Sequence, residues 1–410
     1  MAVIVQKYGG TSVADPERIR AVADRVRDVR AEGNEVVAVV SAMGRTTDQL
    51  LTLAADISSH SHPREMDMLL SAGERITMAL LAMALNERGV PAVSYTGSQA
   101  GILTDSSHGR AKITKITGER VKESLAEGKA VIVAGFQGVD PRRREITTLG
   151  RGGSDATAVA LAASLAADVC EIYTDVDGVF TADPRAVPAA RKLDEVSYDD
   201  MLELAAGGAG VLMPRAVEFG RRFNVPIHVR SSFNDSQGTW VKERTVEQVI
   251  ISGVAHDRSE AKVTVQGVPD QPGVAASVFG RLADAGVNVD MIVQNVSRDG
   301  ATDISFTVPR ANVAEAERLS REAADEVGAL SVDVDGEVGK VSIIGAGMKT
   351  NPGVAAGTFK ALSDAGINIE MISTSTIRIS CVVRADQLEA AVRALHEAFD
   401  PPTLAEESGT

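Results

Sequence analysis

Short apolar runs alternate with longer segments of helical periodicity through the first 245 residues. The runs predict strands and the segments between them predict helices. This alternation indicates an α/β fold, a mainly parallel sheet with helices on both faces. The predicted strands span 3–7, 36–41, 92–95, 130–134, 169–174 and 227–229, and the predicted helices include 16–32, 66–88, 115–127 and 156–167.

The pattern changes beyond residue 245, where the chain carries an internal duplication. Residues 270–292 align with residues 350–372, and 13 of the 23 aligned pairs are identical. In each copy a strand comes first, Pro-Gly begins a helix, and Gly286 or Gly366 ends it. Two more strands and a second helix follow, which predicts a βαββα unit used twice. The predicted strands span 262–268, 287–296, 302–308, 340–344, 367–375 and 377–384, and the predicted second helices span 313–327 and 388–399.

The ends of the two copies predict how they are connected. The first copy runs on into a further strand at 329–334, whereas the second runs into the polar tail 401–410. A spare strand at 249–254 precedes the first copy, and we infer that it completes the sheet of the second. The predicted domains are therefore 1–245, a first module at 262–336, and a second module made of 246–261 and 337–410. Two repeats are too few for a solenoid, so a paired sensor is favoured.

Candidate chemistry begins where the first predicted strand ends, at Lys7-Tyr8-Gly9-Gly10-Thr11-Ser12. Glycines let backbone N–H groups approach phosphate closely, and a lysine neutralises charge that moves during transfer. The string G-x-x-x-x-G-K-[ST] does not occur in the chain, so this is not a Walker A loop. An ordinary tight turn is the alternative interpretation.

A second glycine-rich segment, Leu149-Gly-Arg-Gly-Gly-Ser-Asp155, opens an alanine-rich helix. Ser154 or Asp155 would cap that helix, and the glycines expose N–H groups at the positive end of its dipole. Arg151 can hold a carboxylate or phosphate through two parallel hydrogen bonds. The alternative is an ordinary helix start.

Further polar groups follow the predicted strands. Thr174 and Asp175 end one strand, at the edge where open α/β sheets bind ligands, and could hold a nucleotide and approach its Mg²⁺. An Asp-Gly turn is the alternative, and the spacing does not fit a calcium loop. Glu74, in a predicted helix, suits a substrate ammonium or a solvated helix face. The six histidines form no cluster, and only His108, in Ser106-Ser-His-Gly-Arg110, lies in a segment singled out here, so no Ser-His-Asp or zinc site is predicted.

Composition narrows the class. The 410 residues are 44% hydrophobic but only 3% aromatic, which suits helices packed closely on strands. A net charge of −14 argues against nonspecific nucleic-acid binding. We expect no signal peptide at the start of the chain and no apolar stretch that approaches the ~20 residues needed to span a bilayer. Cys170 and Cys381 show no metal or redox spacing, so we expect a soluble, cytoplasmic protein.

The chain resembles the aspartokinases of the amino-acid kinase family, followed by two ACT (ferredoxin-like) modules. The resemblance is carried by the segments around Lys7, Glu74, Arg151 and Thr174, in this order, and by the duplication after them. The resemblance spans essentially the whole chain. It implies ATP-dependent phosphorylation of L-aspartate to 4-phospho-L-aspartate, the first step towards lysine, threonine, methionine and diaminopimelate. A carboxylate nucleophile is already ionised at neutral pH, since its ordinary pKa is about 4, so no general base is needed. The site then has to position the two substrates and neutralise the charge on the transferring phosphoryl group.

The resemblance also implies roles for individual residues, with Lys7 and Asp155 as the catalytic pair. The aspartate would lie against Ser41, Thr47, Glu74, Arg151, Gly152, Gly153 and Ser154. The ATP would lie against Lys7, Tyr8, Gly9, Gly10, Thr174, Asp175, Phe180, Thr181, Ala182, Asp183, Pro184 and Arg185, and no residue is assigned to Mg²⁺. Effectors would bind Asp270, Gln271, Pro272, Gly273, Val274, Ala275, Asn288, Asp290 and Gln294 in the first copy, and Asn351, Pro352, Gly353, Val354, Ala355, Asn368, Ile369 and Glu370 in the second.

The implied partners are lysine and threonine as joint inhibitors, and further copies of the chain in a dimer or tetramer formed through the ACT modules. A shorter regulatory subunit would need a non-methionine start at Val246 or Val249, because no methionine lies between Met213 and Met291. Two alternatives stay open. Another amino-acid kinase, such as glutamate 5-kinase or acetylglutamate kinase, shares the glycine-rich segments but is disfavoured by the duplication. A catalytically inactive amino-acid sensor is disfavoured by Lys7, Arg151 and Asp155.

Overall fold

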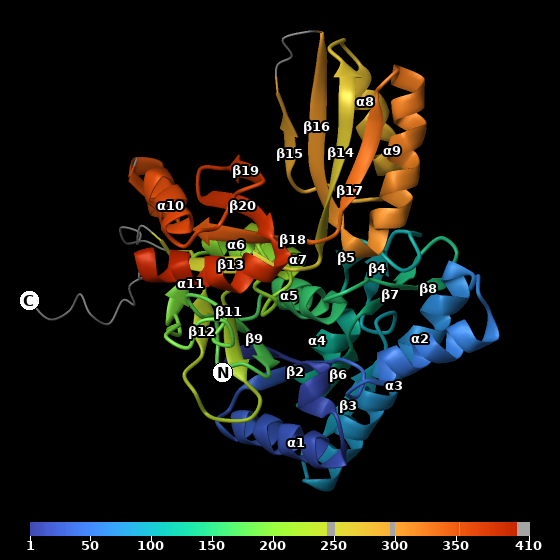
Figure 1. Cartoon of the computed structure of the whole chain (residues 1–410). Helices are drawn as coiled ribbons and strands as arrows, with labels where there is room; N and C mark the ends of the chain where they lie inside the picture. The colour runs from blue at the N-terminus through green and yellow to red at the C-terminus, as the bar shows by residue number, and fades with distance from the viewer. Residues whose placement is uncertain (244–250, 296–299, 352, 400–410) are drawn as a thin grey trace, which may run out of the picture. The chain divides into compact units, whose positions relative to one another are not determined.

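The computed structural model describes residues 1–243, 251–295, 300–351 and 353–399 (Figure 1). Val246, Val249, Pro352 and the tail 401–410, which the sequence analysis names, lie outside these residues. The chain divides into two compact units. The first unit comprises Met1–Val179, Lys192–Ala205 and Gly210–Val246, and the second comprises Phe180–Arg191, Ala206–Ala209 and Glu247–Thr410.

An eight-stranded sheet forms the centre of the first unit, in the order β10-β12-β11-β9-β1-β2-β6-β3. Strands β11 and β12 pair antiparallel, and the other neighbours pair parallel, which confirms the predicted mainly parallel sheet. The strands are β1 (Val3–Tyr8), β2 (Glu35–Val40), β3 (Ala92–Tyr95), β6 (Ala130–Ala134), β9 (Val169–Thr174), β10 (Glu195–Val196), β11 (Ile227–Ser231) and β12 (Thr239–Val241).

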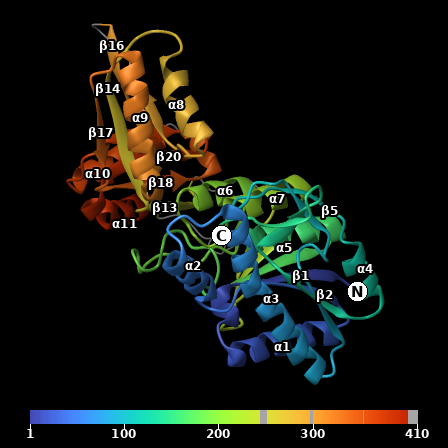
Figure 2. The same cartoon turned by 90° about the vertical axis from the view of Figure 1, so that its right-hand side faces the viewer.

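Helices cover both faces of this sheet (Figure 2). Since successive side chains of a strand point to opposite faces, Tyr8 joins the core formed with α1 and α3, whereas Lys7 points towards α5. The central strand β2 is buried along five of its six residues, as expected for a parallel strand covered on both sides. The helices are α1 (Pro16–Ala31), α2 (Thr46–Ile57), α3 (Pro63–Glu87), α4 (Glu119–Ala126), α5 (Gly153–Leu165), α6 (Tyr198–Ala206) and α7 (Pro214–Phe223).

A smaller sheet of the first unit, in the order β5-β4-β7-β8, is absent from the sequence prediction. Its strands are only three or four residues long, so they produce too short an alternation to be recognised. The strands are β4 (Ile102–Thr104), β5 (Ile113–Ile116), β7 (Gln137–Asp140) and β8 (Glu145–Thr148).

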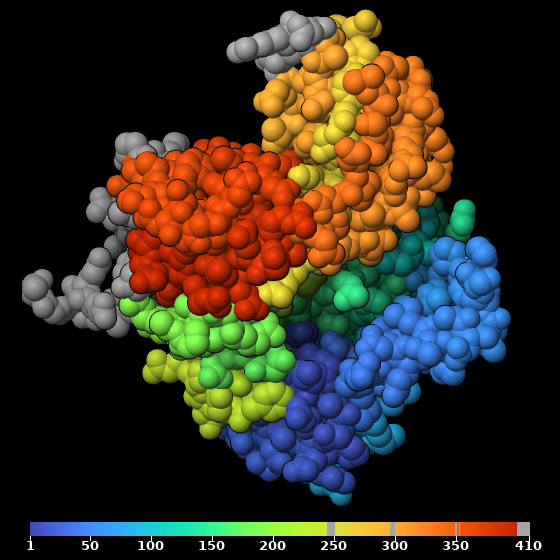
Figure 3. Space-filling view, in the orientation of Figure 1, coloured from blue at the N-terminus to red at the C-terminus, as the bar shows by residue number. Residues whose placement is uncertain are grey.

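Helix α3 corrects one expectation. Within the described residues it is the single helix long and apolar enough, by length and composition, to cross a membrane. The expectation that no stretch approaches that length was therefore wrong. One face of α3 packs against α1, β3, β6 and β8, whereas Ile76 and Met83 on its other face are 52% and 65% exposed. Figure 3 shows the surface that α2 and α3 present, in blue.

The second unit contains two four-stranded antiparallel sheets, one for each copy of the duplication. The first has the order β15-β16-β14-β17 and the second has the order β13-β18-β20-β19. The strand that precedes the first copy, β13, spans Gly253–Asp257 and pairs with β18 of the second copy. Of the predicted strand 249–254, residues 249 and 250 lie outside the described part of the chain. The strands are β13 (Gly253–Asp257), β14 (Glu260–Pro269), β15 (Ile292–Gln294), β16 (Ala301–Pro309), β17 (Ser331–Asp335), β18 (Val338–Ile344), β19 (Met371–Thr374) and β20 (Arg378–Arg384), and the helices are α8 (Val274–Asp284), α9 (Val313–Val327), α10 (Gly353–Asp364) and α11 (Leu388–Phe399).

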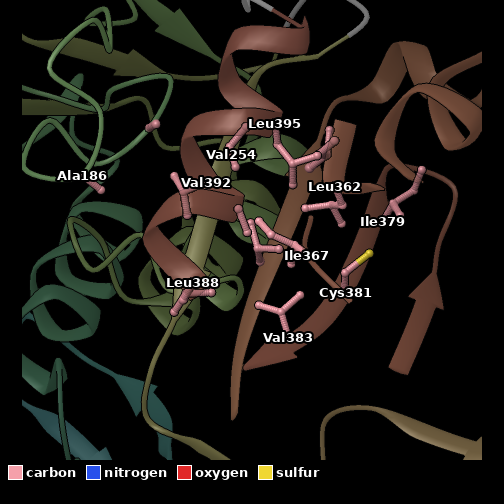
Figure 4. Packing of buried hydrophobic residues seen from close by; sticks show 14 of the residues in the cluster. Ala186, Val254, Leu362, Ile367, Ile379, Cys381, Val383, Leu388, Val392 and Leu395 are labelled. Carbon is pink, nitrogen blue, oxygen red and sulfur yellow. The ribbon is translucent and has the colours of Figure 1, made fainter. Parts of the chain in front are cut away.

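The segment Phe180–Arg191 belongs to the second unit although it precedes residue 245. Ala186 and its neighbours join a core formed by α10, α11, β18 and β20 (Figure 4). Thr181 is fully buried there, and its hydroxyl lies 2.9 Å from Nε2 of His396. Its carbonyl accepts a hydrogen bond from the backbone of Val254. The compact units therefore differ from the predicted linear boundaries, which remain a prediction.

We expect Leu395→Ala, in α11, to destabilise the second unit by about 2–5 kcal/mol, because truncating a leucine that is 1% exposed leaves a cavity. Leu330→Ala is the matched control, since Leu330 is 83% exposed in the same unit. Urea denaturation monitored by circular dichroism measures both. Equal effects of the two substitutions would contradict the packing described here.

Candidate active site

Lys7 and Asp155 form an ion pair at the carboxyl-end edge of the large sheet. Lys7 Nζ lies 2.6 Å from Asp155 Oδ1, and the side chains are 12% and 9% exposed. Asp155 lies in the first turn of α5, so the lysine also faces the positive end of that helix. The prediction that Ser154 or Asp155 caps α5 was wrong. Gly152 is the N-cap, with a φ of 67°, and Asp155 turns its carboxylate to Lys7 instead.

The loops that follow β1 and β2 are in backbone contact. Gly44 N donates to Gly10 O at 3.0 Å, and Ser41 N donates to Tyr8 O at 3.0 Å. A Cβ atom at Gly10 would lie 3.0 Å from Ala42 O, which is too close for the backbone to absorb easily. The glycine is therefore required here by the approach of the neighbouring loop.

Glu74 of α3 lies beneath the loop after β2. Glu74 is 4% exposed, and its Oε1 accepts a hydrogen bond from Ala42 N at 3.2 Å. Its Oε2 is buried and has no hydrogen-bond partner among the described residues. Burial raises the pKa of this carboxyl to about 7, although hydrogen bonds from backbone N–H groups lower it. A buried carboxylate with one open oxygen is suited to receive a cationic group of a ligand.

The residues around Arg151 form a tight turn that presents an exposed guanidinium. A Cβ atom at Gly152 would lie 1.7 Å from Met213 Cγ, so only glycine fits. Gly153 is similarly close to Leu149 and Phe136, and Ser154 packs on Gly135 at the end of β6. Ser154 therefore lies beside the end of β6. Strand β6 pairs with β2, and the loop after β2 carries Ser41. Thr47 lies in the first turn of α2, the helix that follows the loop after β2.

Several residues assigned to the nucleotide have side chains that point elsewhere. Tyr8 is fully buried and its ring stacks on Tyr173, on the sheet face opposite Lys7. Thr181 and Ala182 are buried in the second unit. These three side chains are therefore not available to a nucleotide, and their assignment to it is corrected. Alternation along β1 and long-range packing of Thr181 are the physical reasons.

The other nucleotide candidates are more accessible. Thr174 ends β9, where its hydroxyl donates to Asp175 at 3.2 Å. Arg185 is 91% exposed and forms an ion pair with Asp183, and this pairing lowers the pKa of Asp183. Phe180 is half-buried and Pro184 is exposed. The described contacts do not join the Phe180–Arg185 group to Lys7.

The effector candidates include two carboxylates held across the two modules of the second unit. Asp290 of the first module accepts from Lys340 of the second, and Glu370 of the second accepts from Lys262 of the first. Arg378 and Arg384 lie 3.9 and 3.6 Å from these respective acids. Carboxylates in equivalent places of the two copies are thus neutralised by a lysine of the other copy.

The remaining effector candidates divide into exposed and packed groups. Exposed positions are Asp270, Gln271, Pro272, Gly273, Asn288, Gln294, Gly353 and Asn368. Val274 and Ala275 pack partly on the first core, and Val354, Ala355 and Ile369 pack in or on the second. The amide of Asn351 donates to Gly347 O. Side chains within the cores can shape a pocket but not read a ligand's polar groups.

Sequence reasoning missed three features of the first unit. Phe136 has a φ of 67°, a left-handed conformation that a bulky residue rarely adopts and that marks a constrained site. Asp67 is fully buried in α3 and collects hydrogen bonds from distant segments. A pocket of about 360 Å³ lies on the β11–β12 hairpin, lined by Asp194, His228, Arg230, Asp235, Gln237, Gly238 and Trp240. None of these features has a local signal in the sequence, because each depends on segments that are brought together only by the fold.

Comparison with known proteins places this site in a family. Residues 2–231 match the amino acid kinase family, and residues 263–323 and 341–399 match the ACT domain. The aspartokinase of Mycolicibacterium smegmatis is 59% identical over 405 residues, which cover 97% of this chain and 96% of that protein. E. coli aspartokinase III in complex with aspartate and ADP is 27% identical with a TM-score of 0.84, over 97% of this chain and all of that one. The same enzyme in complex with lysine and aspartate is 28% identical with a TM-score of 0.75, over 97% of this chain and 99% of that one.

The chain is an amino-acid kinase with a pair of ACT modules. More narrowly, it belongs to the aspartokinase family, which confirms the resemblance stated from its motifs.

The raised pKa of Glu74 gives a testable effect on stability. Between its usual value of 4.5 and about 7, the folded protein keeps a proton that the unfolded chain has lost, so stability falls as the pH rises through this window. Glutamine has no charge to desolvate. Glu74→Gln should therefore raise the melting temperature relative to wild type more at pH 8 than at pH 5, measured by differential scanning fluorimetry. Glu87→Gln, an exposed glutamate of the same helix, should show no such difference. A Glu74→Gln gain that does not depend on pH would contradict the assignment.

Proposed function

We propose that this chain transfers the γ-phosphoryl group of ATP to the side-chain carboxylate of L-aspartate, giving ADP and 4-phospho-L-aspartate. The observation that carries the proposal is the buried Lys7–Asp155 pair, which joins the Gly9-Gly10 turn at the carboxyl end of β1 to the glycine-rich segment that opens α5. The identity of 59% to an aspartokinase, over nearly the full length of both chains, supports aspartate as the acceptor.

In the proposed step, a carboxylate oxygen of aspartate attacks the γ-phosphorus. The bond from that phosphorus to the β–γ bridging oxygen breaks, and its electron pair leaves with ADP. Lys7 offsets the charge on the transferring group, and the Gly9-Gly10 turn next to it allows the phosphate to approach the backbone closely. Asp155 fixes the ammonium of Lys7 at 2.6 Å. No proton has to be removed from the nucleophile, so the site requires no general base.

The amino-acid end of the substrate would be held by opposite charges. The open oxygen of Glu74 would accept from the α-ammonium, and the fork of Arg151 would donate to the α-carboxylate. Ser41 and Thr47, which flank the loop above Glu74, would complete the seat. Both charged groups of an α-amino acid would then be recognised while its side chain points to Lys7.

Magnesium would enter with the nucleotide. Within residues 1–243, 251–295, 300–351 and 353–399, no group of three or more His, Cys, Asp or Glu side chains could hold a metal ion. Mg²⁺ is commonly held by phosphates and water with one or two carboxylates, so Asp175, which is exposed at the end of β9, fits as a single additional ligand. Bound there, the ion would neutralise phosphate charge.

Lysine and threonine are the proposed effectors, acting through the ACT modules. The lysine complex of E. coli aspartokinase III supports lysine as one of them. Asp290 and Glu370 occupy equivalent positions in the two copies but differ in length, which suits sites that read different ligands. Both acids are paired with cations of the other module, so a ligand ammonium would compete with Lys340 or Lys262.

Self-association through the ACT modules is part of the same proposal. Strands β15 and β19 are the edge strands of their sheets and contact each other, yet Ile292 and Ile372 on them remain 51% and 42% exposed. Exposed edges that carry apolar residues favour pairing with another chain.

Three further points belong to the proposal. They are the domain boundaries (1–245, 262–336, and 246–261 with 337–410), a regulatory subunit made from an internal start, and a cytoplasmic location.

Lys7→Ala should lower kcat by about 100-fold or more, because transition-state charge loses its stabilising cation. Lys122→Ala, at an exposed lysine in α4 of the same unit, should leave kcat unchanged. A hydroxamate-trapping assay with aspartate and ATP measures both, and thermal melting confirms that each variant folds. A folded Lys7→Ala enzyme with near wild-type kcat would exclude the proposed role. Activity with glutamate but not aspartate would favour a glutamate 5-kinase, and no phosphorylation by the wild type would favour a sensor.

Asp290→Ala should relieve inhibition by lysine plus threonine while leaving the uninhibited kcat within about threefold, since coupling energies of about 1–3 kcal/mol link such sites. Asp284→Ala, at an exposed aspartate in α8 of the same module, should stay inhibited. The same assay with and without both amino acids gives the result. Unchanged sensitivity of the Asp290 variant would remove this residue from the effector site.

A further inference from the structure

A buried carboxylate outside the Lys7–Asp155 pair joins three segments of the first unit. Asp67, near the start of α3, is 0% exposed. Its Oδ2 lies 2.6 Å from Nδ1 of His108, and Gly109 N donates to its Oδ1 at 3.0 Å. The hydroxyl of Thr148 also donates to Oδ1. A buried carboxylate costs free energy unless it is fully hydrogen-bonded. The donors to Asp67 therefore fix the positions of the segment around His108 and of the segment around Thr148 relative to α3.

The donors belong to the loop 105–111 and to the end of β8, and these two segments contact each other directly. Ala111 N donates to Thr148 O at 2.9 Å. A Cβ atom at Gly150 would lie 3.2 Å from Gly109 O, so the two backbones are in close approach. Arg215 of α7 bridges them, donating to Leu149 O at 3.2 Å and to Ala111 O at 3.0 Å. The chain that leads from Thr148 to Arg151 is thus held against the loop.

Asp67 also stands in a fixed relation to the proposed substrate site. It lies seven residues before Glu74 on the buried face of α3, about 10 Å along the helix axis. The same carboxylate therefore ties the segment carrying Arg151 to the helix carrying Glu74. These are the two charges assigned to the ends of the amino acid.

The other side of the His108 ring is engaged as well. Its Nε2 lies 3.4 Å from Glu145 Oε2, and Arg64 Nε donates to Glu145 Oε1 at 3.3 Å. The side chain of His108 is 13% exposed. Because phosphoryl transfer to a carboxylate needs no general base, the proposed chemistry leaves this histidine without a catalytic task.

We propose that Asp67 and His108 are positioning residues, which set the spacing of Arg151 and Glu74 for the α-carboxylate and α-ammonium of the substrate. The inference rests on the proposed function and deepens it. The contact that matters is Nδ1 to Asp67, because it links the loop to α3. The contact of Nε2 with Glu145 holds only the far edge of the ring.

Two amide substitutions separate these contacts. The side-chain amide of asparagine reaches the place of Nδ1, whereas that of glutamine reaches the place of Nε2. We expect His108→Gln and His108→Ala to raise the KM for aspartate by about tenfold, with the KM for ATP within about twofold and kcat within about threefold. His108→Asn should restore the KM for aspartate to within about threefold of wild type. Glu145→Gln, the matched control on the far side of the ring, should leave it within about twofold.

Equal effects of asparagine and glutamine, or parallel rises in both KM values, would overturn the positioning role. Hydrogen–deuterium exchange of the peptide covering residues 105–112 provides a readout that does not depend on activity. Exchange there should increase in His108→Gln and stay at the wild-type level in His108→Asn. If the wild type phosphorylates no aspartate, the proposed function fails. Unchanged exchange in His108→Gln would instead refute the role of the Asp67 contact itself.

Discussion

The contact between Lys7 and Asp155 is the constraint on which the catalytic edge depends. Both side chains are about nine-tenths buried, so removing either leaves a buried charge at a cost of about 3–5 kcal/mol. The pair joins the end of a central strand to the first turn of the helix that covers it. The glycines at positions 10 and 152 follow from this arrangement, because the neighbouring loop and Met213 leave no room for a Cβ atom there.

Much of this could be predicted from the sequence, wherever a signal is local. The valine-rich runs gave the central strands to within one or two residues, because a parallel strand buried on both faces must be continuously apolar. The duplication predicted both βαββα modules, since a repeated Pro-Gly start and Gly end fix a helix in each copy. Lys7 and Asp155 were recognisable because each adjoins a glycine-rich turn.

What the sequence did not predict depends on partners far along the chain. Asp67 is an unremarkable helix aspartate until the loop at 105–111 folds against it, some 40 residues later. The capping role went to Gly152 because Asp155 is drawn to Lys7, a residue from another strand. Thr181 reads as part of a nucleotide loop, yet its hydroxyl meets His396, which is 215 residues away. Local patterns cannot encode such pairings.

The membership of Phe180–Arg191 in the second unit has a consequence for biosynthesis. The chain passes between the units after Val179, Arg191, Ala205, Ala209 and Val246. The buried apolar residues of Phe180–Arg191, namely Ala182, Ala186 and Val187, pack in a core to which α11 contributes. That core is complete only after α11, which begins at Leu388, has been synthesised. During synthesis from the N-terminus, the ribosome therefore releases nearly the whole chain before this segment can be buried. Because each unit is made of three separate stretches of the chain, no single cut yields either unit intact.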